Sequence, residues 1–271
     1  MTQKEADEII ALHKGWLRQP LSLRSKAEGR ARFESVSFSG LSFEAAELGN
    51  AWFYRCDFSN CDLHGACVEG ATMLYCNFDG SNLSGAKLAG AALKNSSFKK
   101  ADLSKADLTG AQLKSADMTG ARLGEATLKD ADISAASLDD AYALGIDLSG
   151  IMARKTHLRR ANLDKALVLG AGFVDCDFSG SSITDAKLIK SEFYSCDLTS
   201  CCLNRSRLED LAFNGCKPRT LELTEVEVVK NGDEISDKCF AAVLSGEIYS
   251  IRWPDEQKFG WRQGKTAIHW R

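Results

Sequence analysis

The feature that most constrains this sequence is an unbroken period of five residues. From residue 33 to residue 213, every position whose number ends in 3 or 8 is apolar, and no insertion or deletion breaks the phase. Two residues before each of these positions, the chain almost always has Ala, Ser, Cys or Thr. A helix would repeat every 3.6 residues and a strand every 2. The period of five therefore predicts a coil that turns a corner after every fifth residue.

The repeated unit is spelled out in ADLSK at 101–105, ADLTG at 106–110 and ANLDK at 161–165. These segments resemble the A-(D/N)-L-x-x unit of the pentapeptide-repeat family, and the resemblance covers residues 31–216. It implies an all-β solenoid, namely a right-handed quadrilateral β-helix with four pentapeptides in each of about nine coils. With strands about 4.8 Å apart, the rod would be about 43 Å long.

The resemblance also implies that each residue lies beneath the residue twenty positions later. Apolar positions at this spacing would then stack inside the rod. Two interior ladders of stacked rings are predicted, one of Phe38, Phe58, Phe78 and Phe98 and the other of Phe173, Phe193 and Phe213.

Two dissimilar ends are expected to flank the rod. Residues 1–30 are predicted to form a helix and a linker that cap it. Thr2 and Glu5 would form a capping box, and the apolar face of a helix over residues 2–17 would comprise Ile9, Leu12, Trp16 and Leu17. The five-residue phase is expected to fail at Pro218, where residues 217–271 would begin a β-rich segment with an alternating strand over 220–229. That segment is interpreted as a separate module, a cap or a dimerisation element.

Composition and motifs argue against an enzyme, a cofactor site or a metal site. Most of the ten cysteines occupy the small inward position and are interpreted as core residues. Cys61, His64 and Cys67 have a spacing that metal sites use, but they would point in different directions. We find no nucleophile-and-base arrangement around the histidines and no glycine-rich phosphate loop.

Charge and hydropathy point to an intracellular protein without affinity for nucleic acid. The net charge of −3 gives no basic domain for phosphate contacts. No apolar stretch is long enough to span a membrane, and the charged start lacks a signal region. We therefore expect a cytoplasmic protein with reduced thiols; injection of such a protein into a host cell remains an alternative.

One side of the predicted rod differs from the other three. We call it the aromatic–basic face; it consists of residues 51–55 and their equivalents at every twentieth position. Aromatic residues flanked by basic ones are typical of protein interfaces. The candidate protein-binding residues are Trp52, Tyr54, Leu74, Tyr75, Lys94, Lys114, Arg154 and Tyr194, with Met152 and Val174 beside them. A second apolar strip on the neighbouring sides comprises Leu144, Leu167, Leu169 and Ile189.

Three functions fit this interpretation, and the first is favoured. The chain is predicted to be a non-enzymatic scaffold that binds a protein partner through the aromatic–basic face. The first alternative is suggested by family members that imitate DNA and protect or inhibit DNA gyrase. The column Asp57, Asn77, Ser97, Asp117, Ser137, His157, Asp177 and Asp197 is too interrupted to support it well. The second alternative is a bacterial effector whose activity lies in residues 217–271. Arg159 and Arg160 are expected to be neutralised by Asp139 and Asp140 one coil below.

Overall fold

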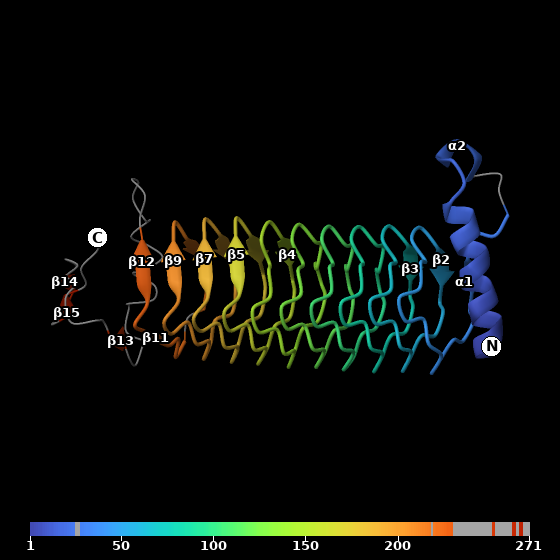
Figure 1. Ribbon diagram of the computed structural model, residues 1–271. Helices are drawn as coiled ribbons and strands as arrows, with labels where there is room; N and C mark the ends of the chain where they lie inside the picture. Colours follow the sequence, from blue (N-terminus) through green and yellow to red (C-terminus); the bar gives the residue numbers. More distant parts are fainter. Residues whose placement is uncertain (25–27, 218, 230–250, 253–261, 264–265, 268–271) are drawn as a thin grey trace.

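A computed structural model shows the predicted β-solenoid, a straight rod of about nine turns with a helix at its N-terminal end (Figure 1). The structure describes residues 1–24, 28–217, 219–229, 251–252, 262–263 and 266–267. Every β-pairing that joins two described residues between 32 and 229 is parallel and spans twenty positions, as the period of five with four units per coil requires.

Regular strands occur on two adjacent sides of the rod. On the aromatic–basic face, β1 (Arg32–Glu34), β2 (Trp52–Tyr54) and β3 (Thr72–Leu74) form one parallel sheet, and β4 (Met152–Arg154), β6 (Gly172–Val174), β8 (Glu192–Tyr194) and β10 (Ala212–Asn214) form another. The preceding side carries a parallel sheet of β5 (Leu167–Leu169), β7 (Lys187–Ile189), β9 (Arg207–Glu209) and β12 (Glu227–Val229). Short pairs also join β11 (Leu223–Thr224) to β13 (Ile251–Arg252) and β14 (Arg262–Gln263) to β15 (Thr266–Ala267).

The corners of the coil come from a left-handed residue at every fifth position. From residue 35 to residue 225, every residue whose number ends in 0 or 5 has a φ between 49° and 74°. The N–H of the next residue then donates to the carbonyl three residues before it and closes the corner; for example, the Ala86 N–H donates to Leu83 O at 3.0 Å. Glycine is favoured at such a position, yet Tyr75 and Lys100 also adopt it.

Both predicted phenylalanine ladders are present in the core. Phe58 and Phe78 stack with ring centroids 5.2 Å apart, and Phe78 and Phe98 stack at 4.8 Å. The second ladder ends with Phe193 and Phe213 at 4.9 Å, where Phe213 is only half-buried. Each ring thus fills the volume above the ring of the preceding coil.

The small inward position takes polar side chains because a main-chain carbonyl lies within their reach. The Ser96 hydroxyl donates to Met73 O at 2.8 Å, and the Thr156 hydroxyl donates to Ile133 O at 2.8 Å. The Cys61 thiol donates to Phe38 O at 3.0 Å in the same way. Cysteine is therefore one of several small residues that satisfy a buried carbonyl, which confirms the structural interpretation of these thiols.

The coil register continues beyond residue 216. Leu221, Leu223 and Val226 are buried at the inward positions, and β12 pairs with β9 twenty residues earlier. The prediction that the phase fails at Pro218 and that one alternating strand spans 220–229 is therefore wrong. This stretch contains a corner at Glu225, which separates β11 from β12. Most of the expected β-rich C-terminal segment lies outside the described residues.

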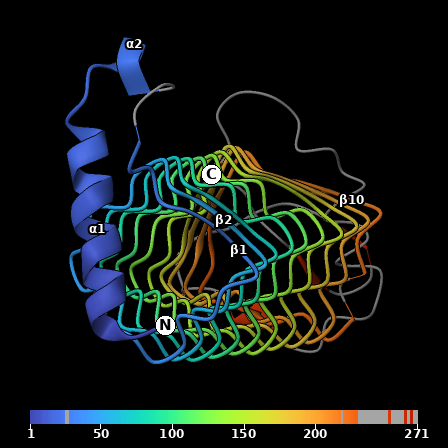
Figure 2. The ribbon, with the colours of Figure 1, turned by 90° about the vertical axis from the view of Figure 1, so that its right-hand side faces the viewer.

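The N-terminal segment forms α1 (Gln3–Leu17) and the short α2 (Leu21–Arg24). The Thr2 and Glu5 capping box is present. The predicted apolar face is wrong at Leu12, whose side chain is 63% exposed, because the helix instead buries Ala6, His13 and Trp16. Figure 2 shows that α1 lies along one part of the rod's end and leaves β1 uncovered.

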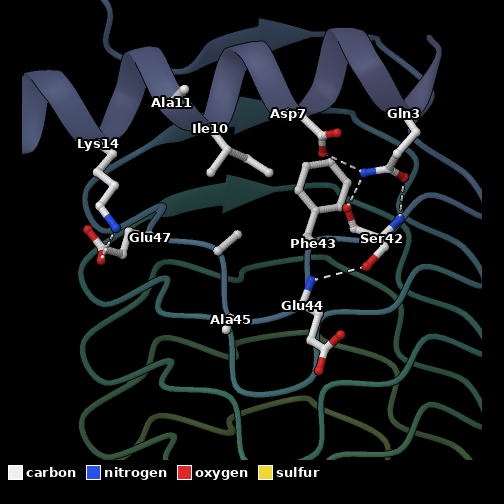
Figure 3. A pocket seen from close by; sticks show the side chains of 11 residues that line it. Gln3, Asp7, Ile10, Ala11, Lys14, Ser42, Phe43, Glu44, Ala45 and Glu47 are labelled. Carbon is white, nitrogen blue, oxygen red and sulfur yellow. Dashed lines mark hydrogen bonds and ion pairs between the residues drawn. The ribbon is translucent and has the colours of Figure 1, made fainter.

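Polar side chains of α1 bind the first coil. The Gln3 carboxamide donates to Ser42 O at 2.7 Å and accepts from the Ser42 N–H at 2.8 Å. His13 lies 2.9 Å from both Gly49 O and the Ala31 N–H. A depression of about 480 Å³ between helix and coil is closed at opposite ends by the Gln3 contacts and by an ion pair between Lys14 and Glu47 (Figure 3).

Candidate protein-binding face

The predicted aromatic residues meet near the N-terminal end of the aromatic–basic face. Trp52 and Tyr54 project side by side from β2, with ring centroids 6.0 Å apart and planes at 15°. Tyr75, at the corner after β3, meets Tyr54 edge-on at 5.6 Å and is 50% exposed. Leu74 is half-buried beside them. The structure therefore brings four of the eight candidate residues into one cluster.

Two arginines flank this cluster in a way that sequence reasoning did not specify. The Arg32 guanidinium lies over the Trp52 ring at 4.8 Å from its centroid, and the Arg55 guanidinium lies over Tyr54 at 5.1 Å. Stacking on a ring fixes a guanidinium plane while leaving its edge N–H groups available to an acceptor. The twenty-residue step places Arg32 directly beneath Trp52, so this contact could have been found from the register alone.

The remaining candidate cations stand on the same face without an ionic partner. Among the described residues, no ion pair involves Lys94, Lys114 or Arg154. Lys114 and Arg154 are exposed, and Lys94 is half-buried. Their charge is therefore directed to solvent rather than neutralised within the rod.

Cations on the other sides are neutralised far more often. Arg159 donates from Nε to Asp139 at 2.9 Å, and Arg160 donates from Nε and Nη2 to the two carboxylate oxygens of Asp140, each at 2.7 Å. This confirms the predicted neutralisation. On the same side, Lys99 pairs at 3.0 Å with Asp117, eighteen positions later in the next coil, which removes one carboxylate of the predicted acidic column from the free surface.

The other candidate residue, Tyr194, belongs to a second apolar group on the same face. Its side chain is 39% exposed, and Met152 is 67% exposed. The Met152 side chain lies over Gly172, where any larger residue would displace it. Leu144, on the side of residues 141–145, and Leu169, on the side of residues 166–170, belong to the second apolar strip and are also exposed. Sequence reasoning missed Tyr142, whose ring is 66% exposed near Leu144 in the sequence.

The cysteine–histidine motif does not converge. Burial raises the pKa of the Cys61 thiol to about 11, and this thiol points into the rod. His64 points outward and bonds the Ser84 hydroxyl through Nδ1 at 2.9 Å. Within the described residues, no three His, Cys, Asp or Glu side chains are grouped so that they could hold a metal ion. In the same residues, we find no helix long and apolar enough to cross a membrane.

Comparison with known proteins agrees with this architecture. The family model described as "Pentapeptide repeat region" matches residues 51–128, and the model "Pentapeptide repeats (8 copies)" matches residues 171–210. A search of curated proteins found no match.

Two solved structures of pentapeptide-repeat proteins are similar to this chain. One is HetL, described as involved in heterocyst differentiation regulation, from the cyanobacterium Nostoc sp. strain PCC 7120. It is 24% identical, with a TM-score of 0.57 over 76% of this chain and 94% of HetL. The other is full-length QnrB1, a plasmid-mediated fluoroquinolone resistance protein. It is 18% identical, with a TM-score of 0.42 over 79% of this chain and 99% of QnrB1. The family models and the unbroken twenty-residue register together place this chain in the pentapeptide-repeat family.

Proposed function

We propose that this protein is a non-enzymatic scaffold that binds an acidic segment of a partner protein along the aromatic–basic face. The observation that carries the proposal is that Lys94, Lys114 and Arg154, in line with the aromatic cluster around Trp52, form no ion pair within the described part of the chain. An acidic partner segment would supply the missing counter-charges, while its apolar residues would cover the rings.

The rigidity of the rod supports this role. The face is made of parallel strands and, around Lys94 and Lys114, of parallel β-bridges between the coils, so its main chain holds fixed spacings before any partner arrives. A pre-organised surface loses little conformational entropy on binding. The aromatic rings would supply contact area, and the cations would select and orient the partner.

The two alternatives have less support. DNA mimicry needs free rows of carboxylates, whereas Asp117 and Asp139 are paired with cations of neighbouring coils. An effector role would rest on residues 217–271, most of which lie outside the described residues. We therefore retain gyrase only as a named partner to look for in the experiment below.

Affinity capture from the native cell, read out by mass spectrometry, tests the proposal. The variant Lys94→Glu, Lys114→Glu, Arg154→Glu with Trp52→Ala should lose the acidic partner while its melting temperature stays within a few degrees. A matched variant, Lys87→Glu, Lys129→Glu and Lys187→Glu, reverses three exposed cations on another side and should keep the partner. Equal capture by both variants would refute the chosen face. Enrichment of gyrase subunits by both variants would favour the DNA-mimic alternative.

A further inference from the structure

Each coil of the rod binds the coil before it through the same main-chain groups. In the second coil, the Trp52 N–H donates to Ala31 O at 2.9 Å, and Tyr54 O accepts from the Ser35 N–H at 2.8 Å. At the next corner, Asp57 O accepts from the Phe38 N–H at 2.7 Å. In each pentapeptide, the second residue thus forms hydrogen bonds to the preceding coil through both its N–H and its C=O. The fourth residue forms one through its C=O. The first coil has no preceding coil, so these groups point away from the rod.

Among the described residues, the cap satisfies some of these groups on two sides. Gln3 takes both the N–H and the C=O of Ser42, and so replaces a residue of a missing coil. His13 takes Gly49 O. These contacts lie on the sides of residues 41–45 and 46–50, over which α1 passes. The edge strand on those sides is therefore partly covered by the chain itself.

The edge on the aromatic–basic face is left open. Strand β1 is the outermost strand of the sheet β1–β2–β3 and, within the described part of the chain, pairs only with β2. In that same part we find no partner for the Arg32 N–H, for Arg32 O or for Glu34 O. Phe33 stacks on Phe53 at 5.9 Å but is only half-buried, whereas Phe53 is 1% exposed. The end of the core is thus accessible beside an unpaired strand edge (Figure 2).

We propose that the free edge of β1 binds an extended segment of a partner protein by strand addition. The added segment would occupy the place that a preceding coil takes elsewhere in the rod. Unpaired edge strands are templates for such additions, which draw affinity from main-chain hydrogen bonds and specificity from alternate side chains. β1 belongs to the aromatic–basic face, and its Arg32 stacks on Trp52, but the site lies at the end of the rod, away from Lys94, Lys114 and Arg154.

The side chains of β1 define the chemistry of the added strand. Each described pairing in the rod is parallel, so the added strand runs parallel to β1 and its residues lie opposite Arg32, Phe33 and Glu34 in that order. Opposite charges on neighbouring strands attract, and like charges repel. The added strand therefore carries an acidic residue, then an apolar residue that covers Phe33, then a basic residue.

A labelled peptide tests this site in the full-length protein. The probe is a fluorescein-labelled ten-residue peptide with Asp-Leu-Lys at its centre, and its control has Lys-Leu-Asp instead. The first peptide should bind saturably in fluorescence anisotropy and should slow hydrogen exchange of the Arg32 amide. The double variant Arg32→Glu, Glu34→Arg should reverse the preference between the peptides by roughly fivefold. Its melting curve and the amide spectrum of the distant coils would show that the rod is intact.

The outcomes separate this site from the proposed function. The variant Lys94→Glu, Lys114→Glu, Arg154→Glu should bind the Asp-Leu-Lys peptide as the unaltered chain does, even if it loses its protein partner. Absence of saturable binding at millimolar peptide would overturn the proposal, as would a preference that the Arg32 and Glu34 exchange leaves unchanged. Tighter binding of the Lys-Leu-Asp peptide by the unaltered chain would overturn the parallel orientation.

Discussion

Replacing His13 with Ala should release the N-terminal cap from the rod. The imidazole is completely buried, with Nδ1 accepting from the Ala31 N–H and Nε2 donating to Gly49 O, both at 2.9 Å. A buried main-chain group that loses its partner costs about 1–3 kcal/mol. The ring also stacks on Trp16 at 5.2 Å, a contact worth about 0.5–1.5 kcal/mol. Because water would reach part of the vacated site, we expect a loss of about 2–4 kcal/mol in cap stability.

Hydrogen exchange measures this loss where it occurs. In a solenoid each unit contacts only its neighbours, so the amides of α1 and of the first coil should exchange faster while those of the middle coils change little. A loss of about 2.7 kcal/mol would correspond to a hundredfold faster exchange of the α1 amides that report cap release.

The neighbouring residue provides the control. Lys14 forms a 2.8 Å ion pair with Glu47, and both side chains are more than 40% exposed. Exposed pairs contribute at most about 1 kcal/mol, so Lys14→Ala should accelerate exchange by less than tenfold. If His13→Ala and Lys14→Ala accelerated exchange equally, the argument that the buried imidazole fixes the cap would be refuted.

Three further predictions concern pH, ion pairing and the core. Burial is the main cause that lowers the pKa of His13 below 6.5, so the unfolded cap binds a proton more readily than the folded cap does. Cap stability measured by denaturation should therefore be constant above about pH 7 and fall as the pH drops below 6.5. The variant His13→Gln should remove this dependence on pH. Arg159→Met should lower the denaturation midpoint more than Arg160→Met, because Asp139 is nearly buried and would lose its charged partner, at a cost of about 1–3 kcal/mol. Phe78→Ala should cost about 3–5 kcal/mol in chemical denaturation, since its ring lies fully buried in the first ladder; a loss below 1 kcal/mol would contradict the packing argument.

The repeated part of the molecule follows from the sequence because its geometry is set by short-range periodicity. Once each residue is placed beneath its equivalent twenty positions later, the Phe58–Phe78 stack and the Arg160–Asp140 pair follow without further information. The same step places Lys155 beside Asp175, yet no ion pair joins them. Long exposed side chains lose conformational entropy on pairing, and periodicity carries no information on that balance.

The N-terminal end of the rod was harder to predict because residues 1–30 carry no five-residue repeat. The apolar pattern of α1 favours Leu12 as a core residue, but the helix turns His13 inward to satisfy main-chain groups of the first coil. The unpaired main-chain groups of a terminal coil produce no periodic pattern in the sequence, so the residue that pairs with them is not predicted by periodicity. At the other end, Pro218 and the glutamates that follow obscure a register that continues to Val229.

The left-handed corners also determine how such a rod can assemble. A non-glycine residue such as Lys100 or Tyr75 adopts the left-handed conformation at a conformational free-energy cost of about 1–2 kcal/mol. Each coil bears this cost whether or not a neighbouring coil is present. The compensating ring stacks and most of the main-chain bonds lie between coils. An isolated coil would therefore bear the strain without most of the gain. Formation of the rod accordingly resembles one-dimensional crystal growth, with an unfavourable nucleus of a few coils that is extended one coil at a time from either end.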